Sequence, residues 1–164
     1  MMHTHTRILA VLLLFISCGL SAQENCEFTQ GTCDLPGEKQ AGLQVSMLDN
    51  TIKNNYHIQL IDYNHTKQFL KIIVTDNLGF GKTASLLLKS GSKQIFFKSV
   101  TLKPIDKTSA YFIVDLYSNY VVTLKEYGLT NIIFNDNMEF VIPRQDSETI
   151  KQSAKCFYSL TTKK

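Results

Sequence analysis

The sequence predicts an α+β fold that is rich in antiparallel β-strand, with about eight strands in a meander or sandwich-like arrangement. Two observations lead to this prediction. Segments between residues 43 and 116 alternate apolar and polar residues as half-buried strands do, and short turn-rich connections separate them. After residue 117 the apolar period changes to that of amphipathic helices. We therefore expect one short helix and a C-terminal helix packed on the sheet.

The strand candidates follow one another without any long insertion, which favours antiparallel neighbours. In the first candidate Leu43, Val45 and Met47 share one face, and in the second the alternate residues from Tyr56 to Leu60 do. The run Phe69–Val74 is apolar on both faces apart from one lysine, which predicts a central strand. The six candidates are Leu43–Leu48, Tyr56–Tyr63, Phe69–Val74, Ala84–Lys89, Gln94–Leu102 and Ala110–Leu116.

A short helix and a hairpin are predicted next. Ser118 can act as the N-cap of a helix over Asn119–Tyr127, and Gly128 suits the left-handed backbone that ends many helices. The segments Thr130–Phe134 and Met138–Ile142 then form a hairpin about an Asn-Asp-Asn turn, because these residues tolerate positive φ.

The chain closes with a second predicted helix. Pro143 ends the hairpin, and Asp146 or Ser147 can cap a helix that runs to about Leu160. Its apolar residues repeat at intervals of four and three and make one core-facing stripe. The stripe consists of Ile150, Ala154 and Phe157, with Cys156 at its edge.

Residues 1–22 read as an export signal. Arg7 gives a positive start, and the apolar run Ile8–Leu20 has 13 residues, whereas a membrane-spanning helix needs about 20. We expect residues 23–42 to form an irregular N-terminal arm, because they are polar and rich in turn residues, and residues 43–164 to form a single α+β domain.

Two cleavage sites imply two locations. Cleavage after Ala22 would release a secreted or periplasmic protein. The segment Phe15–Cys18 resembles the lipobox of bacterial lipoproteins, although Phe15 takes the place of the usual Leu. Under this alternative Cys18 is acylated, and the protein is an outer-membrane lipoprotein that meets the membrane only through its lipid anchor.

Composition restricts the class of partner. Removal of residues 1–22 leaves 142 residues, which is one ordinary domain. Without Arg7, 16 basic side chains face 14 acidic ones, and a net charge of +2 is far below that of nucleic-acid-binding proteins.

The charge is distributed unevenly along the sequence, however, because the stretch Lys82–Lys107 holds six lysines and one acid. Five of these lysines form a candidate anion-binding surface, and the alternative is that they prevent sheet edges from aggregating. They are Lys89, Lys93, Lys98, Lys103 and Lys107.

Three cysteines remain after signal removal: Cys26, Cys33 and Cys156. In an oxidising compartment two of them should pair, and we expect Cys26–Cys33 slightly ahead of the alternatives because the chain already holds these two close together. An odd count leaves one thiol free or directs it to a second chain.

Other sequence patterns do not amount to a catalytic or cofactor site. The segment Asp76–Thr83 ends in Gly-Lys-Thr like a phosphate-binding loop, but an Asp replaces its first glycine and no helix is predicted after it, so we expect no nucleotide. His57 and His65 lack a third ligand at metal-binding spacing. A cysteine nucleophile at Cys156 with either histidine as base is the weaker interpretation, because Cys156 borders a core-facing stripe.

From these observations we expect a small exported, non-catalytic protein that binds another protein or a component of the cell envelope, without nucleic acid or any cofactor. The first alternative is a small envelope enzyme, hydrolase-like, with a dispersed site. It requires a pocket that holds His57 or His65 near Cys156, Asp62 or Asp115. The second alternative is an inhibitor or immunity protein that neutralises an envelope toxin.

Overall fold

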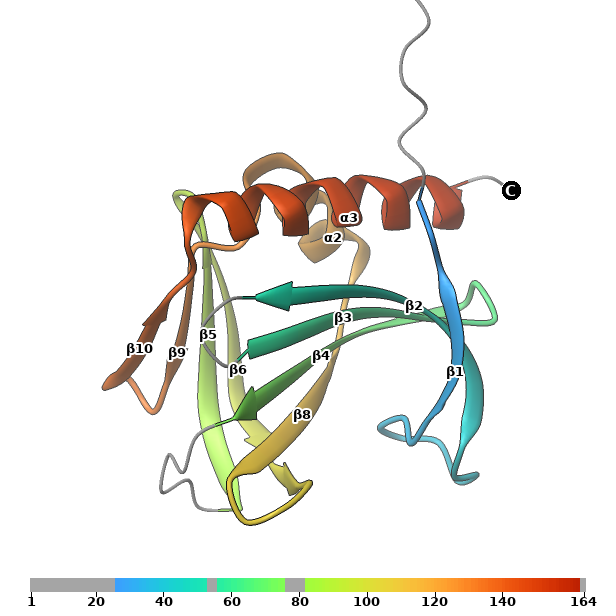
Figure 1. The fold of residues 1–164 in the computed structure, drawn as a ribbon, viewed down its shortest axis with the longest axis horizontal. Coiled ribbons are helices and arrows are strands. Elements are labelled where there is room, and N and C mark those ends of the chain that lie inside the picture. The colour runs from blue at the N-terminus through green and yellow to red at the C-terminus, as the bar shows by residue number, and fades with distance from the viewer. Residues whose placement is uncertain (1–25, 53–55, 76–81, 163–164) are drawn as a thin grey trace, which may run out of the picture.

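A computed structural model describes residues 26–52, 56–75 and 82–162 of the chain. Two antiparallel sheets pack together, and two helices cover one end of them (Figure 1). The strands of the two sheets run in different directions in this view, and the C-terminal helix lies across the top. The predicted α+β, antiparallel β-rich class with a C-terminal helix on the sheet is confirmed.

The larger sheet has six strands in the order β1-β2-β3-β4-β8-β7. Every neighbouring pair is antiparallel, and β4 lies between β3 and β8, as its two-sided apolar pattern predicts. The strands span Thr29–Cys33 (β1), Leu43–Ile52 (β2), Tyr56–Tyr63 (β3), Lys67–Thr75 (β4), Lys103–Pro104 (β7) and Ser109–Asp115 (β8).

The smaller sheet has four antiparallel strands in the order β10-β9-β5-β6. At the β9–β10 turn Asn135 and Asp136 have φ of 48° and 60°, so the predicted Asn-Asp-Asn hairpin is confirmed. The strands span Thr83–Ser90 (β5), Lys93–Thr101 (β6), Asn131–Phe134 (β9) and Met138–Val141 (β10).

The core lies between the two sheets and under helices α2 (Ser118–Tyr127) and α3 (Arg144–Thr162). The predicted stripe of α3 is fully buried in it. The six-stranded sheet is apolar on its other face as well: Val45 of β2 packs with Ile61 and Phe69 in a second, smaller cluster. The apolar stripes predicted for β2 and β3 thus lie on opposite faces of this sheet.

Both helices begin earlier than their predicted caps. Tyr117 occupies the N-cap position of α2 and makes no side-chain cap, so Ser118 is already helical. Helix α3 begins at Arg144, because Pro143 accepts the first helical hydrogen bond, from the Ser147 N–H at 2.9 Å. Asp146 and Ser147 therefore lie inside α3, where neither can occupy its N-cap position.

The N-terminal arm is not wholly irregular, because β1 lies within it and pairs along its length with β2. We missed this strand since its residues, Thr29–Cys33, show no apolar alternation. The strand also explains why the expected Cys26–Cys33 pairing is wrong. The extended residues from Thr29 to Cys33 span about 13 Å, and Cys26 lies before the start of this strand, whereas a disulfide needs Cα atoms within about 7 Å. Cys26 instead bonds Cys156 of α3, with Cα atoms 5.7 Å apart, and Cys33 is a free, buried thiol.

Candidate functional site

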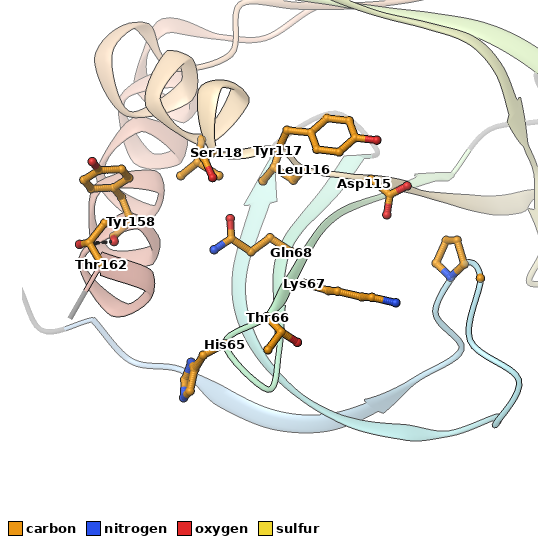
Figure 2. A pocket seen from close by; sticks show the side chains of 13 residues that line it. His65, Thr66, Lys67, Gln68, Asp115, Leu116, Tyr117, Ser118, Tyr158 and Thr162 are labelled. Atoms are coloured by element: carbon orange, nitrogen blue, oxygen red, sulfur yellow. Dashed lines mark hydrogen bonds between the residues drawn. The ribbon is translucent and has the colours of Figure 1, made fainter. Parts of the chain in front are cut away.

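A hollow of about 700 Å³ opens where the six-stranded sheet meets the helices (Figure 2). It lies between the β3–β4 turn, the connection from β8 to α2, the end of α3 and a short piece of the arm. The Leu116 N–H donates to the Gln68 carbonyl at 2.8 Å, which ties the β8–α2 connection to β4. The lining side chains come from Pro36, His65, Thr66, Lys67, Gln68, Asp115, Leu116, Tyr117, Ser118, Val121, Tyr158 and Thr162.

Lys67, which lines this hollow, forms an ion pair with a carboxylate of the N-terminal arm. Lys67 donates to the Glu38 carboxylate, which joins β4 to the arm. This hydrogen bond and the negative charge of Glu38 raise the pKa of the Lys67 ammonium. The pair therefore holds the arm beside the hollow.

His65 enters the wall of the hollow from the β3–β4 turn. Its Nδ1 lies 2.8 Å from the Asp62 Oδ2, and its backbone N–H donates to the same oxygen at 3.3 Å. The Asp62 side chain is 1% exposed and the His65 side chain is 63% exposed. Figure 2 shows the His65 ring turned away from Ser118 and from Asp115. The pair thus orients an imidazole at the surface, without bringing it to a hydroxyl group of the hollow.

The other predicted residues lie elsewhere. His57 Nε2 lies 2.7 Å from Asp49 Oδ1, and Gln59 donates to the same oxygen at 2.6 Å, on the outer face of the six-stranded sheet. Partial burial acts to raise the pKa of Asp49, but the hydrogen bonds from Gln59 and His57 outweigh it and lower that pKa. Among the described residues no three metal-ligating side chains gather.

Cys156 is held in the disulfide with Cys26, so it is not a thiolate nucleophile in this structure. It borders a separate hollow of about 340 Å³, with Leu48 and the outer side of α3. Residues Asp76–Gly81 of the glycine-containing segment lie outside the described residues. Thr83 begins strand β5, whereas a phosphate-binding loop would lead into a helix at this position.

The five lysines of the candidate anion-binding surface are divided between the two sheets. Lys89 of β5 pairs with Glu139 of β10 at 3.0 Å. Lys93 and Lys98 lie on the edge strand β6, whereas Lys103 lies on β7 with its Nζ 5.9 Å from the centre of the Tyr111 ring. Lys107 lies between β7 and β8. The anion-binding surface stays a prediction, and the lysines on β6 are placed where they would protect a free edge.

A second hollow, of about 440 Å³, adjoins the first, and both are lined by Pro36, Asp115 and Tyr117. Tyr117 is 61% exposed. Its ring lies edge-on to Tyr120 with 5.6 Å between centres, and Tyr120 contacts Phe97 of β6 in the same way at 6.0 Å. The exposed Tyr117 ring is thus supported by ring contacts with Tyr120, and through it Phe97, where the two hollows adjoin.

Sequence reasoning did not identify Tyr117 as a site residue. A usable signal was its place between the end of a predicted strand and the start of a predicted helix, where a large side chain has no sheet or helix face to join.

Comparison with known proteins found no matching family model, no matching curated protein and no matching solved structure. In the part of the chain that the structure describes, no helix is long and apolar enough to span a bilayer.

Proposed function

We propose that this chain is an exported, non-catalytic binding protein that holds another protein or an envelope component against Tyr117 and the two hollows beside it. The observation that carries this proposal is the exposed, braced Tyr117 ring at the junction of the two hollows. Tyrosine supplies contact area with little loss of conformational freedom, and it is enriched among residues that dominate binding energy.

Polar groups around the ring support a binding role. Asp115 offers a carboxylate, Gln68 an amide and Ser118 a hydroxyl, all of them lining the larger hollow. Such a mixture of one aromatic surface and a few polar groups is typical of recognition sites. The His65 ring is paired with the buried Asp62 carboxylate, and Cys156 is held in a disulfide.

Export is supported by the pattern of residues 1–22 and by the Cys26–Cys156 geometry, since disulfides persist in oxidising compartments. N-terminal sequencing and intact mass of the protein from its source cell test this. We expect a chain that begins at Gln23 or, for the lipoprotein alternative, an acylated chain that begins at Cys18. A cytoplasmic protein that retains Met1 would contradict export.

Binding is tested with the mature chain as bait for solubilised envelope material. The Tyr117→Ala variant should capture at least about tenfold less of the bound component than the wild type does. One hot-spot residue often contributes the binding free energy that corresponds to such a loss. Phe96→Ala is the matched control, since Phe96 is similarly exposed but lines neither hollow, and it should bind like the wild type. Equal capture by the Tyr117→Ala variant would refute the proposed site.

The hydrolase alternative is favoured by one observation, the His65–Asp62 pair in the wall of the larger hollow. It predicts turnover of ester or peptide substrates that falls by about a hundredfold or more in His65→Asn. Turnover with that dependence, without any captured component, would replace the binding proposal. The inhibitor or immunity alternative predicts a single, tightly bound protein that co-purifies with the chain.

A further inference from the structure

The smaller of the two hollows lies where the chain passes from one sheet to the other. Strand β6 ends at Thr101 in the four-stranded sheet, and β7 begins at Lys103 in the six-stranded sheet. The change occurs at Leu102, whose N–H donates to the Lys82 carbonyl at 3.0 Å, on the β5 side. Strand β7 therefore covers only the start of β8, through the pairs Lys103↔Tyr111 and Pro104↔Ala110.

Beyond Tyr111 the free side of β8 has no neighbouring strand among the described residues. We call this place, beside Phe112–Asp115, the vacant strand position. A longer β7 would have filled it, but the preceding residues belong to β6 and to the other sheet. Strands β6 and β8 approach each other here without pairing.

The backbone of β8 offers hydrogen-bonding groups to the vacant strand position. The Leu116 N–H donates to Gln68 of β4, and alternate residues of a strand direct their backbone groups to the same side, so Val114 and Phe112 also face β4. On the opposite side the Ser109 carbonyl accepts the Ile105 N–H at 2.9 Å. Ile113 and Asp115 have the same parity as Ser109, and their backbone groups therefore face the vacant strand position.

The hollow of about 440 Å³ coincides with this position. It is lined by consecutive residues of both strands, and since consecutive side chains point to opposite faces, the hollow runs along the strand edges rather than over one face. Buried Val100 and Val114 supply apolar surface to it, and the exposed Tyr117 also lines it. The lining from β6 and β8 comprises Phe97, Ser99, Val100, Thr101, Ile113, Val114 and Asp115.

The two free edges that meet here differ in their protection. Strand β6 carries Lys93 and Lys98 and an irregular register opposite β5, and both features discourage a further strand from adding. The stretch Ile113–Asp115 of β8 carries neither a lysine nor a shift in its register with β4. Of these two edges, β8 is the one that is open to strand addition.

Charges at the two ends of the vacant strand position are opposite. At the β7 end Lys71 and Lys103 place their Nζ atoms 4.9 and 5.9 Å from the centre of the Tyr111 ring. At the other end Asp115, the last residue of β8, lines the hollow. An added strand antiparallel to β8 would start beside this carboxylate and end beside the lysines, where Leu102 and Lys103 block its continuation.

We propose that this position accepts the carboxy-terminal segment of a partner polypeptide, about four residues long, as an added antiparallel strand on β8. The terminal carboxylate meets Lys103 and Lys71, and a basic residue at the start of the segment meets Asp115. This inference rests on the proposed binding function and specifies the chemistry of the partner.

The first test uses peptides, so it does not depend on any variant of the protein. Random heptapeptides with free carboxyl ends are displayed and selected on the mature, disulfide-bonded chain. We expect selected peptides with alternating β-branched residues whose affinity falls at least about tenfold when the terminal carboxyl is amidated. Alternate backbone nitrogens of the peptide would face β8, and their methylation should cause a similar loss of affinity. Methylation of the intervening nitrogens, which face away from β8, should change affinity less than about twofold.

The second test removes the donor on β8. Ile113→Pro deletes an N–H that faces the vacant strand position and should abolish peptide binding, whereas Ile113→Ala trims the same side chain but keeps the N–H and should retain most of it. Circular dichroism checks that both variants are folded. If Ile113→Pro fails to fold, the methylated peptides still decide the question.

The outcomes separate this inference from the proposed function. No selected peptide, or peptides that bind equally well with either set of nitrogens methylated, would overturn strand addition. If the Tyr117-dependent capture from envelope material succeeds at the same time, the binding function survives with a different ligand, such as a glycan. If both experiments fail, both proposals fall.

Discussion

The two faces of the six-stranded sheet are buried in different ways. The inner face packs on the second sheet and on α3, and its side chains, such as Ile58, Ile72 and Phe112, are fully buried. The outer face has only a small apolar cluster, which the arm covers by placing Leu35 at 5% exposure over Val45. Beyond that cluster the outer face turns polar at Asp49 and His57. The difference indicates that the inner face holds the fold together, while the outer face depends on a segment that the disulfide attaches.

The largest effect should come from separating the arm from α3. Cys26→Ser opens a loop that spans 130 residues, and in the chain-entropy model such a cross-link contributes up to about 5 kcal/mol to the free energy of unfolding. Urea denaturation of the oxidised wild type and of the variant measures it. In the folded wild type Cys33 should resist alkylation, because burial raises the pKa of its thiol. Rapid alkylation of three thiols in unreduced protein would contradict the pairing.

On the inner face we expect Phe112→Ala to destabilise the protein by about 3–5 kcal/mol, because it leaves a cavity in a closely packed core. Phe112 is fully buried and lies edge-on to Phe134, with 5.4 Å between ring centres. Thermal and urea unfolding of the same sample check the value. A loss below about 1 kcal/mol would mean that the inner face is not the main source of stability.

The outer face should respond less to the same kind of change. Leu35→Ala should cost about 2–3 kcal/mol, at the low end for a buried leucine, because the arm can settle onto the sheet after the change. Amide exchange of β1 and β2 should then increase before that of β3. A cost equal to that of Phe112→Ala would remove the distinction between the two faces.

The smallest effect concerns the polar part of the outer face. The pKa of Asp49 is lowered in the fold, so its contribution is present above the unfolded pKa of about 3.9 and is lost as the pH falls through the lower folded value. Because Asp49 is partly exposed, the contribution should be less than about 1 kcal/mol. Asp49→Asn should therefore lower the free energy of unfolding by less than about 1 kcal/mol at pH 7, and it should leave that free energy almost unchanged at a pH well below the folded pKa, where the wild-type carboxyl is protonated as well. An equal loss at pH 7 and at low pH would indicate a structural role that does not depend on the charge.

The inner face was predictable from sequence, because its residues follow a regular period. Alternation in β3 and the stripe of α3 mark core positions without any knowledge of the neighbours. The Asn135-Asp136 turn was equally local, since these residues accept positive φ. In each case the signal lies within a few residues of the feature.

The outer face and the candidate site were not predictable, because they depend on distant pairings. Strand β1 is held by backbone bonds to β2 and lacks an apolar period. Cys26 lies before β1 and Cys33 ends it, and the structure brings Cys26 to Cys156 of α3. The smaller hollow lies where the chain changes sheets at Leu102, and this change has no local signature; the place of Tyr117 between a strand and a helix has one, but the hollows on either side of it depend on distant segments.

The Cys26–Cys156 bond also determines how the molecule would bear mechanical tension. It joins a residue near the start of the described chain to one in the last two turns of α3. A force applied between the two ends of the chain is therefore carried by the sulfur bridge and by the few helical residues after Cys156. The 130-residue loop between the cysteines, which contains both sheets and the whole lining of the smaller hollow, bears none of that load, whereas Tyr158 and Thr162 of the larger hollow lie outside it. Under oxidising conditions the smaller hollow would therefore keep its shape while the chain ends are pulled.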